Sequence, residues 1–123
     1  MAKTILVVED NSKDLTLIRD MLKVSGYETI EATDGKQGIE LAKRNKPDLI
    51  LLDIMMPEMD GYTACYAIKR DKATKAIPVI MVTGLDYSLN KKLGKDLGAD
   101  GYVTKPLVLQ ELLDVIHRFL PTS

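Results

Sequence analysis

Short runs of consecutive apolar residues recur along the chain, separated by mixed polar and apolar stretches. The clearest runs are rich in Val, Ile and Leu and cover residues 5–8, 49–52 and 79–82. Runs of this length that do not alternate with polar residues are typical of strands buried on both faces of a parallel sheet. The predicted strands cover residues 4–8, 27–31, 48–53, 77–82 and 101–104.

The stretches between these runs have helical periodicity, and several carry capping signals. Asn11 or Ser12 can cap a first helix, and Gly26 can close it in a left-handed conformation. Asp34 is placed to open a second helix, whose end is marked by Pro47. The predicted helices cover residues 12–24, 35–45, 61–70, 86–97 and 107–119.

Regular alternation of strands and helices predicts a doubly wound α/β fold with a five-stranded parallel sheet. The strand–helix units account for nearly all 123 residues, so we expect one domain over residues 1–123. The flavodoxin-like strand order of such sheets is 2-1-3-4-5. In that order the first and third strands are neighbours at the switch point, where ligands bind outside the carboxyl ends of the strands.

Each predicted strand but one ends in a polar group suited to a metal ion or a phosphate. Glu9 and Asp10 follow the first strand, and Asp53 ends the third. Thr83 follows the fourth strand and Lys105 the fifth. Because the carboxyl ends of parallel strands meet at one rim, these side chains should converge. Three neighbouring carboxylates repel one another unless a cation is present, and an all-oxygen ligand set favours Mg²⁺.

Such a rim is suited to phosphoryl transfer, which requires the oxygens of the transferred group to be neutralised and held in line. Mg²⁺ and Lys105 can supply positive charge, and Thr83 can donate a hydrogen bond. Asp53, in the middle of the crevice, is the natural nucleophile and would form an aspartyl phosphate. The only histidine, His117, lies on the flank of the apolar stripe of the last helix, so we expect a surface residue without a catalytic role.

Composition changes this interpretation little but excludes several alternatives. The apolar content of 46% and charged content of 28% are typical of globular domains. The net charge is −1 with dispersed basic residues, which argues against nucleic-acid binding. No apolar run approaches the ~20 residues of a membrane span, and no signal peptide precedes the first strand, so we expect a cytoplasmic protein. The single Cys65 excludes an internal disulfide and is expected to pack as a small apolar group.

Four segments resemble the receiver domain of two-component response regulators. They are VEDN at 8–11, LDIMMPEMDG at 52–61, VTG at 82–84 and GYVTKP at 101–106. The match covers the whole chain with its motifs in the correct order. The resemblance implies a stand-alone, chemotaxis-regulator-like domain that is a signalling phosphoacceptor, not an enzyme, although it takes part in its own phosphoryl transfer and slow dephosphorylation.

The resemblance also implies how the metal and the phosphate are held. Asp53 would accept phosphate from a sensor histidine kinase or a histidine phosphotransfer protein. Asp10, Asp53 and the main-chain carbonyl of Met55 would hold Mg²⁺, with Glu9 helping through water. In this family a cis peptide bond usually precedes the proline that matches Pro106.

A second set of implied roles concerns signalling. Thr83 and Lys105 would grip the phosphoryl group, and Tyr102 would report its presence by changing rotamer. Output would pass to a downstream protein effector, with a weak or phosphorylation-dependent homodimer left open. The phosphodonors of the family commonly dock on the first helix, which makes Leu17 a candidate contact.

The last helix carries apolar residues outside its core stripe. Val108, Val115 and Phe119 form this second stripe. Either the helix buries a wide face over the edge of the sheet, or the stripe is a docking or dimer surface. The sequence leaves both interpretations open.

Two other functions remain as alternatives. A phosphatase-like hydrolase of the haloacid-dehalogenase type would also form an aspartyl phosphate, but it usually carries a second Asp two residues later, where this chain has Met55. A flavin-binding, flavodoxin-like protein would need a Ser/Thr/Gly-rich phosphate loop after the first strand, where this chain has Glu9 and Asp10. A receiver fold that acts without phosphate is disfavoured, because every expected member of the site is present.

Overall fold

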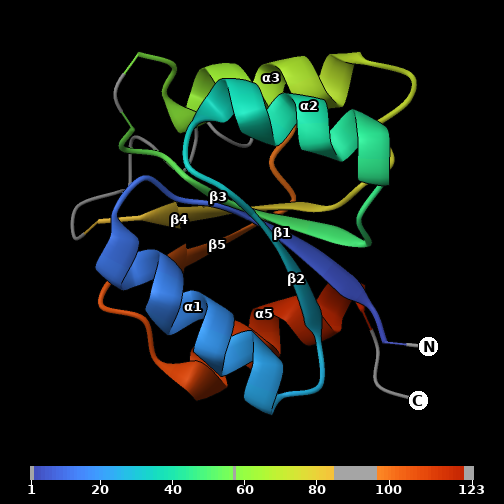
Figure 1. The fold of residues 1–123 in the computed structure, drawn as a ribbon. Coiled ribbons are helices and arrows are strands. Elements are labelled where there is room, and N and C mark those ends of the chain that lie inside the picture. The colour runs from blue at the N-terminus through green and yellow to red at the C-terminus, as the bar shows by residue number, and fades with distance from the viewer. Residues whose placement is uncertain (1, 57, 85–96, 121–123) are drawn as a thin grey trace.

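A central parallel sheet is covered by helices on both faces (Figure 1). The computed structural model describes residues 2–56, 58–84 and 97–120. The strand order is β2-β1-β3-β4-β5, as the sequence predicts. The strands are β1 (Thr4–Val8), β2 (Glu28–Ala32), β3 (Leu49–Asp53), β4 (Val79–Thr83) and β5 (Gly101–Thr104).

The helices form the two outer layers (Figure 1). α1 (Ser12–Val24) and α5 (Leu109–Phe119) cover one face of the sheet, and α2 (Gly35–Asn45) and α3 (Gly61–Arg70) cover the other. The helix predicted at 86–97 lies outside the described residues, apart from Leu97, which is in a turn. None of the described helices is long and apolar enough to cross a membrane.

The capping signals are used as predicted. The Asn11 side chain accepts a hydrogen bond from the main-chain N–H of Asp14 at 3.0 Å, and Gly26 follows α1 with a φ of 92°. Asp34 caps α2 by accepting from the N–H of Gln37 at 2.8 Å. Local side-chain chemistry therefore determines where the chain enters and leaves these helices.

Several element boundaries differ by one or two residues from the predicted ones. β2 starts at Glu28 because the N–H of Tyr27 is bound to the carbonyl of Leu22 in the turn that ends α1. β4 starts at Val79 because Pro78 has no N–H to give to the sheet, and it extends to include Thr83. β3 and α5 likewise start later than predicted, at residues 49 and 109.

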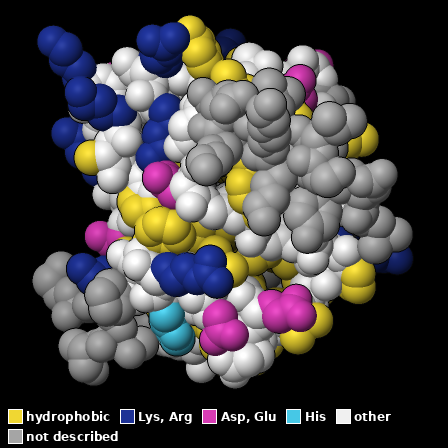
Figure 2. Space-filling view, turned by 180° about the vertical axis from the view of Figure 1, so that it is seen from behind, with side chains coloured by type: hydrophobic (Ala, Val, Ile, Leu, Met, Phe, Trp, Pro, Cys, Tyr) yellow, Lys and Arg dark blue, Asp and Glu magenta, His cyan; other side chains and the backbone are white. Residues whose placement is uncertain are grey.

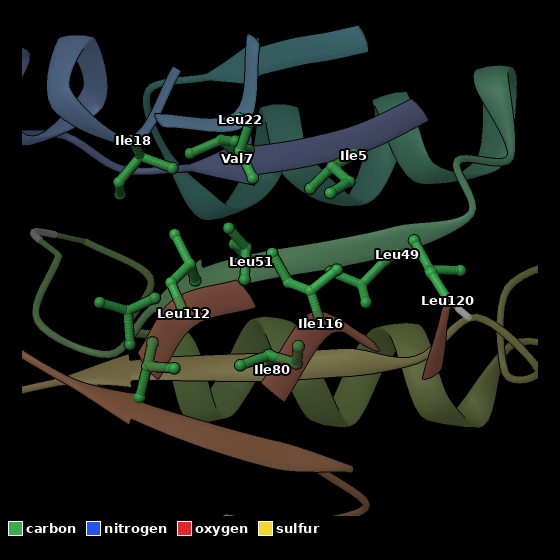
Figure 3. Close-up of a cluster of buried hydrophobic side chains, with 12 residues drawn as sticks. Ile5, Val7, Ile18, Leu22, Leu49, Leu51, Ile80, Leu112, Ile116 and Leu120 are labelled. Carbon is green, nitrogen blue, oxygen red and sulfur yellow. The ribbon is translucent and has the colours of Figure 1, made fainter. Parts of the chain in front are cut away.

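Alternating side chains along the central strands enter two separate cores, which explains the continuous apolar runs. Ile5 and Val7 of β1 pack toward α1 and α5, in the cluster shown in Figure 3. Leu6 and Val8 pack toward α2 and α3, where the buried Cys65 also lies. β3 and β4 alternate in the same way, so the predicted burial of both faces is confirmed.

Two of the three residues in the second apolar stripe of α5 are partly buried against the core. Val115 and Phe119 pack against the cluster of Figure 3, and a Cβ at Gly101 would lie 3.3 Å and 3.4 Å from their side chains. Only Val108 is well exposed, at 51%. Partial burial against the core therefore favours the wide buried face for two of these three residues. On the face shown in Figure 2, hydrophobic side chains still gather between charged ones.

Candidate functional site

The register of β1 and β3 brings two carboxylates side by side at the carboxyl edge of the sheet. Val8 pairs with Leu52, so Glu9 and Asp53 are the next residues along the two strands. Both are buried, with 1% and 4% of their surface exposed. Asp10 is exposed, yet one carboxylate oxygen from each of these three acids lies within 4.8 Å of the others. The predicted convergence of the three acids is confirmed.

The donor atoms of this cluster fit a hard divalent cation. The Oε2 atom of Glu9 accepts a hydrogen bond from the N–H of Asn11 at 3.2 Å. Its Oε1 atom is buried and makes no hydrogen bond of good geometry to the described residues, although it lies 2.9 Å from Lys105 Nζ. A buried oxygen with spare coordination capacity, among carboxylates alone, suits Mg²⁺ rather than a softer metal.

The environment of Glu9 opposes its ionised form. Burial, followed by the close approach and the charge of the Asp53 carboxylate, raises the pKa of Glu9 to about 7, while Lys105 and the N–H of Asn11 act in the opposite direction. Without a metal, Glu9 therefore holds a proton for part of the time at neutral pH. A nearby cation would shift the group toward its ionised form.

Asp53 is held by the loop that leads from β3 to α3. Its Oδ1 atom accepts a hydrogen bond from the N–H of Met55 at 3.2 Å, and the side chain of Met55 is exposed. The N–H of Ile54 donates to Val82 of the neighbouring strand at 3.1 Å. Leu52, on the other side, pairs with Val8 and Met81, so the main chain before and after Asp53 is held in the sheet and the positions of the carboxylate are limited.

Lys105 reaches across the rim from the loop after β5. Its Nζ lies 2.9 Å from Glu9 Oε1, 2.8 Å from Asp14 Oδ2 and 3.6 Å from Asp53 Oδ2. Burial lowers the pKa of Lys105, but its contacts with these carboxylates raise it above the ordinary value. The lysine is therefore a permanent cation at the centre of the site. The peptide bond between Lys105 and Pro106 is cis, as the family resemblance implies.

Asp14 is the member of this site that the sequence did not reveal. It lies in the first turn of α1, where an acidic residue is expected merely because it favours the positive end of the helix dipole. Its position in the sequence could have indicated this role. Because β1 leads directly into α1 at the rim, the first turn of this helix lies beside the strand ends. Its pairing with Lys105 spans 91 residues of sequence.

Thr83 lies on β4, the neighbour of β3, and Tyr102 lies on β5, which pairs with β4. Thr83 ends β4, is 3% exposed and pairs in register with Thr104, and its carbonyl accepts from the N–H of Lys105 at 2.7 Å. Tyr102 is half-buried and packs against the cluster on the α2 and α3 side of the sheet. His117 is exposed on α5, as predicted.

The rim thus combines a buried aspartate with a lysine, a buried hydroxyl and a carboxylate cluster suited to a cation. Together with the strand order, these groups define a doubly wound α/β protein whose switch point has the side chains suited to a phosphoryl group and a metal.

Comparison with known proteins identifies the family. The chain belongs to the response regulator receiver domain family, whose model matches residues 5–117. It is 40% identical to the DNA-binding dual master transcriptional regulator RpaA of Synechocystis sp., over 94% of this chain and 48% of RpaA. It is 35% identical to the polar-differentiation response regulator DivK of Brucella anthropi, over 98% of both chains.

One similar solved structure contains a metal ion. The receiver domain of the sensor histidine kinase PA1611 from Pseudomonas aeruginosa, solved with a magnesium ion coordinated in its active-site cleft, is 30% identical with a TM-score of 0.90. The match covers 99% of this chain and 100% of that domain.

Family membership assigns this chain to two-component signalling and favours that function over the phosphatase-like alternative. The chain spans about half the length of RpaA and nearly all of DivK.

Proposed function

We propose that Asp53 accepts a phosphoryl group from a phosphohistidine of a sensor kinase or phosphotransfer protein, and that phosphorylation switches a protein-binding surface. The observation that carries this proposal is the position of the buried Asp53 carboxylate, next to a permanent cation and within a carboxylate cluster. Such a nucleophile is shielded from water and lies at the carboxyl edge of the sheet, where a partner would present the phosphoryl group.

The metal in this proposal is Mg²⁺. Asp10, Asp53 and the main-chain carbonyl of Met55 would hold it, and Glu9 would contribute through water. When bound, the ion would neutralise phosphoryl oxygens and the mutual repulsion of the acids. The all-carboxylate donor set and the buried Oε1 atom of Glu9 support this assignment.

In the transfer step, a carboxylate oxygen of Asp53 attacks phosphorus as the bond from phosphorus to the donor imidazole nitrogen breaks. The electron pair of that bond leaves with the imidazole, and the product is an aspartyl phosphate. Lys105 stabilises the negative charge on the phosphoryl oxygens, since its Nζ is 3.6 Å from Asp53 Oδ2.

The signal then passes through β4 and β5. The hydroxyl of Thr83 donates a hydrogen bond to the phosphoryl group, and Tyr102 changes rotamer in response. A downstream protein effector binds the altered surface.

Docking of the phosphodonor on α1 is compatible with the 43% exposure of Leu17. The single buried cysteine fits a reducing, cytoplasmic setting.

The test is phosphorylation by acetyl phosphate with Mg²⁺, followed by intact mass measurement. Wild type should gain one phosphoryl group, Asp53→Asn should gain none, and EDTA should suppress the reaction. Asp20→Asn is a matched control, because Asp20 is an exposed acid of α1 whose only described ion pair is a 3.7 Å contact with Arg19. Equal labelling of Asp53→Asn and wild type would exclude Asp53 as the acceptor.

A further inference from the structure

Lys105 is closer to Asp14 than to the proposed phosphoacceptor. Its Nζ lies 2.8 Å from Asp14 Oδ2 and makes a hydrogen bond to it, whereas Asp53 Oδ2 is 3.6 Å away. Glu9 Oε1 takes a second short contact, at 2.9 Å. The ammonium group therefore points toward β1 and α1 rather than directly at Asp53.

Asp14 is held firmly in this position. Its own N–H donates to Asn11 Oδ1 at 3.0 Å, and the N–H of Leu15 donates to the carbonyl of Asn11 at 2.9 Å. One turn further along, Ile18 is 1% exposed and anchors α1 on the sheet. The carboxylate of Asp14, in contrast, is 37% exposed and lies outside the carboxylate cluster that fits a metal.

Three carboxylates thus share one ammonium group, which has three hydrogens to donate. A phosphoryl group on Asp53 adds negative charge and further acceptor oxygens beside Lys105. To bind these oxygens, the ammonium must turn toward Asp53 and away from Asp14. Whatever the contact with Asp14 contributes in the unphosphorylated protein is then lost.

We propose that Asp14 is a positioning residue that draws Lys105 away from Asp53 and competes with the phosphoryl group for its ammonium. Asp14 thereby sets how tightly the site holds the phosphoryl group. This inference rests on the proposed function, because it requires Asp53 to be the phosphoacceptor. If Asp14 served only to stabilise the start of α1, its replacement would change the stability of the protein but not its affinity for a phosphoryl group.

The test measures the affinity for beryllofluoride, a phosphoryl analogue, at saturating Mg²⁺ by fluorine NMR. Asp14→Asn should bind it about threefold to tenfold more tightly than wild type, a range set by the modest strength of partly exposed ion pairs. Asp14→Glu, which keeps the charge, should stay close to wild type. Asp20→Asn removes one charge from the same helix away from Lys105 and should also leave the affinity unchanged. Unchanged or weaker binding by Asp14→Asn would overturn the proposal.

A double-mutant cycle with Lys105→Met separates this role from a general effect of charge. Asp14→Asn should have no effect on beryllofluoride affinity when Lys105 is already replaced, because the competition acts through the ammonium. The same gain in both backgrounds would contradict the proposal. Binding of beryllofluoride by Asp53→Asn with wild-type affinity would instead overturn the proposed function, and this inference with it.

Discussion

The first residue of α3, Gly61, packs against the main chain of Asp53. A Cβ atom at position 61 would overlap the carbonyl oxygen of Asp53 and lie 2.7 Å from the Cα of Ile54. The N–H of Gly61 also donates to the carbonyl of Ile54 at 2.9 Å. The start of α3 therefore packs directly on the strand end that carries Asp53, the proposed phosphoacceptor.

Gly61→Ala should lower the free energy of unfolding by about 3 kcal/mol, because the added methyl group meets main chain that cannot rotate away. It should also reduce labelling by acetyl phosphate, since relief of the overlap displaces Asp53. Urea unfolding and intact mass measure the two effects. The control is Gly26→Ala, at a φ of 92° with no atom near its Cβ, which should cost only about 1 kcal/mol and leave labelling intact. Equal stability losses in the two variants would exclude the proposed overlap.

The predictable part of this molecule is the part that depends on local pattern. Apolar runs marked the strands, and the polar residue after each run marked the rim, so Glu9, Asp53 and Lys105 could be grouped before their distances were known. Their convergence follows from parallel strands and one strand order. The exposure of His117 and the burial of Cys65 follow from helical periodicity in the same way.

The unpredicted part depends on tertiary packing. Asp14 joins the site only because α1 lies over β1 and because Lys105 extends across the rim to reach it. Val115 and Phe119 belong to the core because Gly101 leaves room beside them on β5, which no periodicity of α5 reveals.

The second prediction concerns the pH dependence of stability without metal. The pKa of Glu9 is raised from 4.5 to about 7 in the folded protein, so the folded state binds the proton more strongly than the unfolded state. This contribution to stability is fully present below pH 4.5 and is lost as the pH rises through 7. In EDTA, the wild type should lose about 2 kcal/mol from this group between about pH 5 and pH 7.

Glu9→Gln removes the titrating group and should flatten that part of the profile. Urea unfolding of both proteins at several pH values measures the difference. Mg²⁺ should bind wild type more weakly as the pH falls below about 7, because protonation of Glu9 removes negative charge from the cluster that would hold the cation. Parallel stability profiles for wild type and variant would show that Glu9 is ionised throughout this range.

The third prediction concerns the salt bridge between Lys69 and Asp100, which lies at the opposite end of the strands from the candidate site. Lys69 of α3 lies 2.7 Å from Asp100 Oδ2 and donates to the carbonyl of Ile77 at 2.6 Å. Asp100 Oδ2 also accepts a hydrogen bond from the N–H of Val79 at 2.8 Å. The salt bridge therefore holds the first residue of β4 beside the turn into β5. At the other end of these two strands, Thr83 ends β4 and Lys105 directly follows β5.

Lys69→Met keeps the length of the side chain but leaves the Asp100 carboxylate and the Ile77 carbonyl without the ammonium. The free energy of unfolding should fall by about 2 kcal/mol, as expected for a partly buried charged hydrogen bond. Lys43→Met, which breaks the more exposed pair with Asp71, should cost less than about 1 kcal/mol. Chemical denaturation measures the free energy of unfolding of both variants. A similar small decrease in the two would show that the salt bridge between Lys69 and Asp100 contributes little to stability.

The last prediction separates phosphorylation from signal transmission. Thr83→Ala should still accept phosphate, because Asp53, Lys105 and the carboxylate cluster remain. The variant should nevertheless transmit poorly, because in the proposed mechanism the hydroxyl is the group that draws β4 toward the phosphate. A ligand shifts an equilibrium between two conformations only by its differential interaction with them. A hydrogen bond to a charged group contributes about 1.5–3 kcal/mol, enough to change the affinity for a partner by about one to two decades.

The measurement uses protein with fluorinated tyrosine, in which Tyr102→Phe assigns the fluorine resonance of Tyr102. Beryllofluoride should shift this resonance in wild type and in Thr83→Ser, which keeps the hydroxyl, but much less in Thr83→Ala. Saturation in each case is checked on the signal of the bound beryllofluoride, so weak binding cannot be mistaken for weak transmission. A full shift in saturated Thr83→Ala would show that the signal reaches Tyr102 without this hydroxyl. The route would then have to start from Lys105, whose N–H is bound to the carbonyl of Thr83 whether or not the hydroxyl is present.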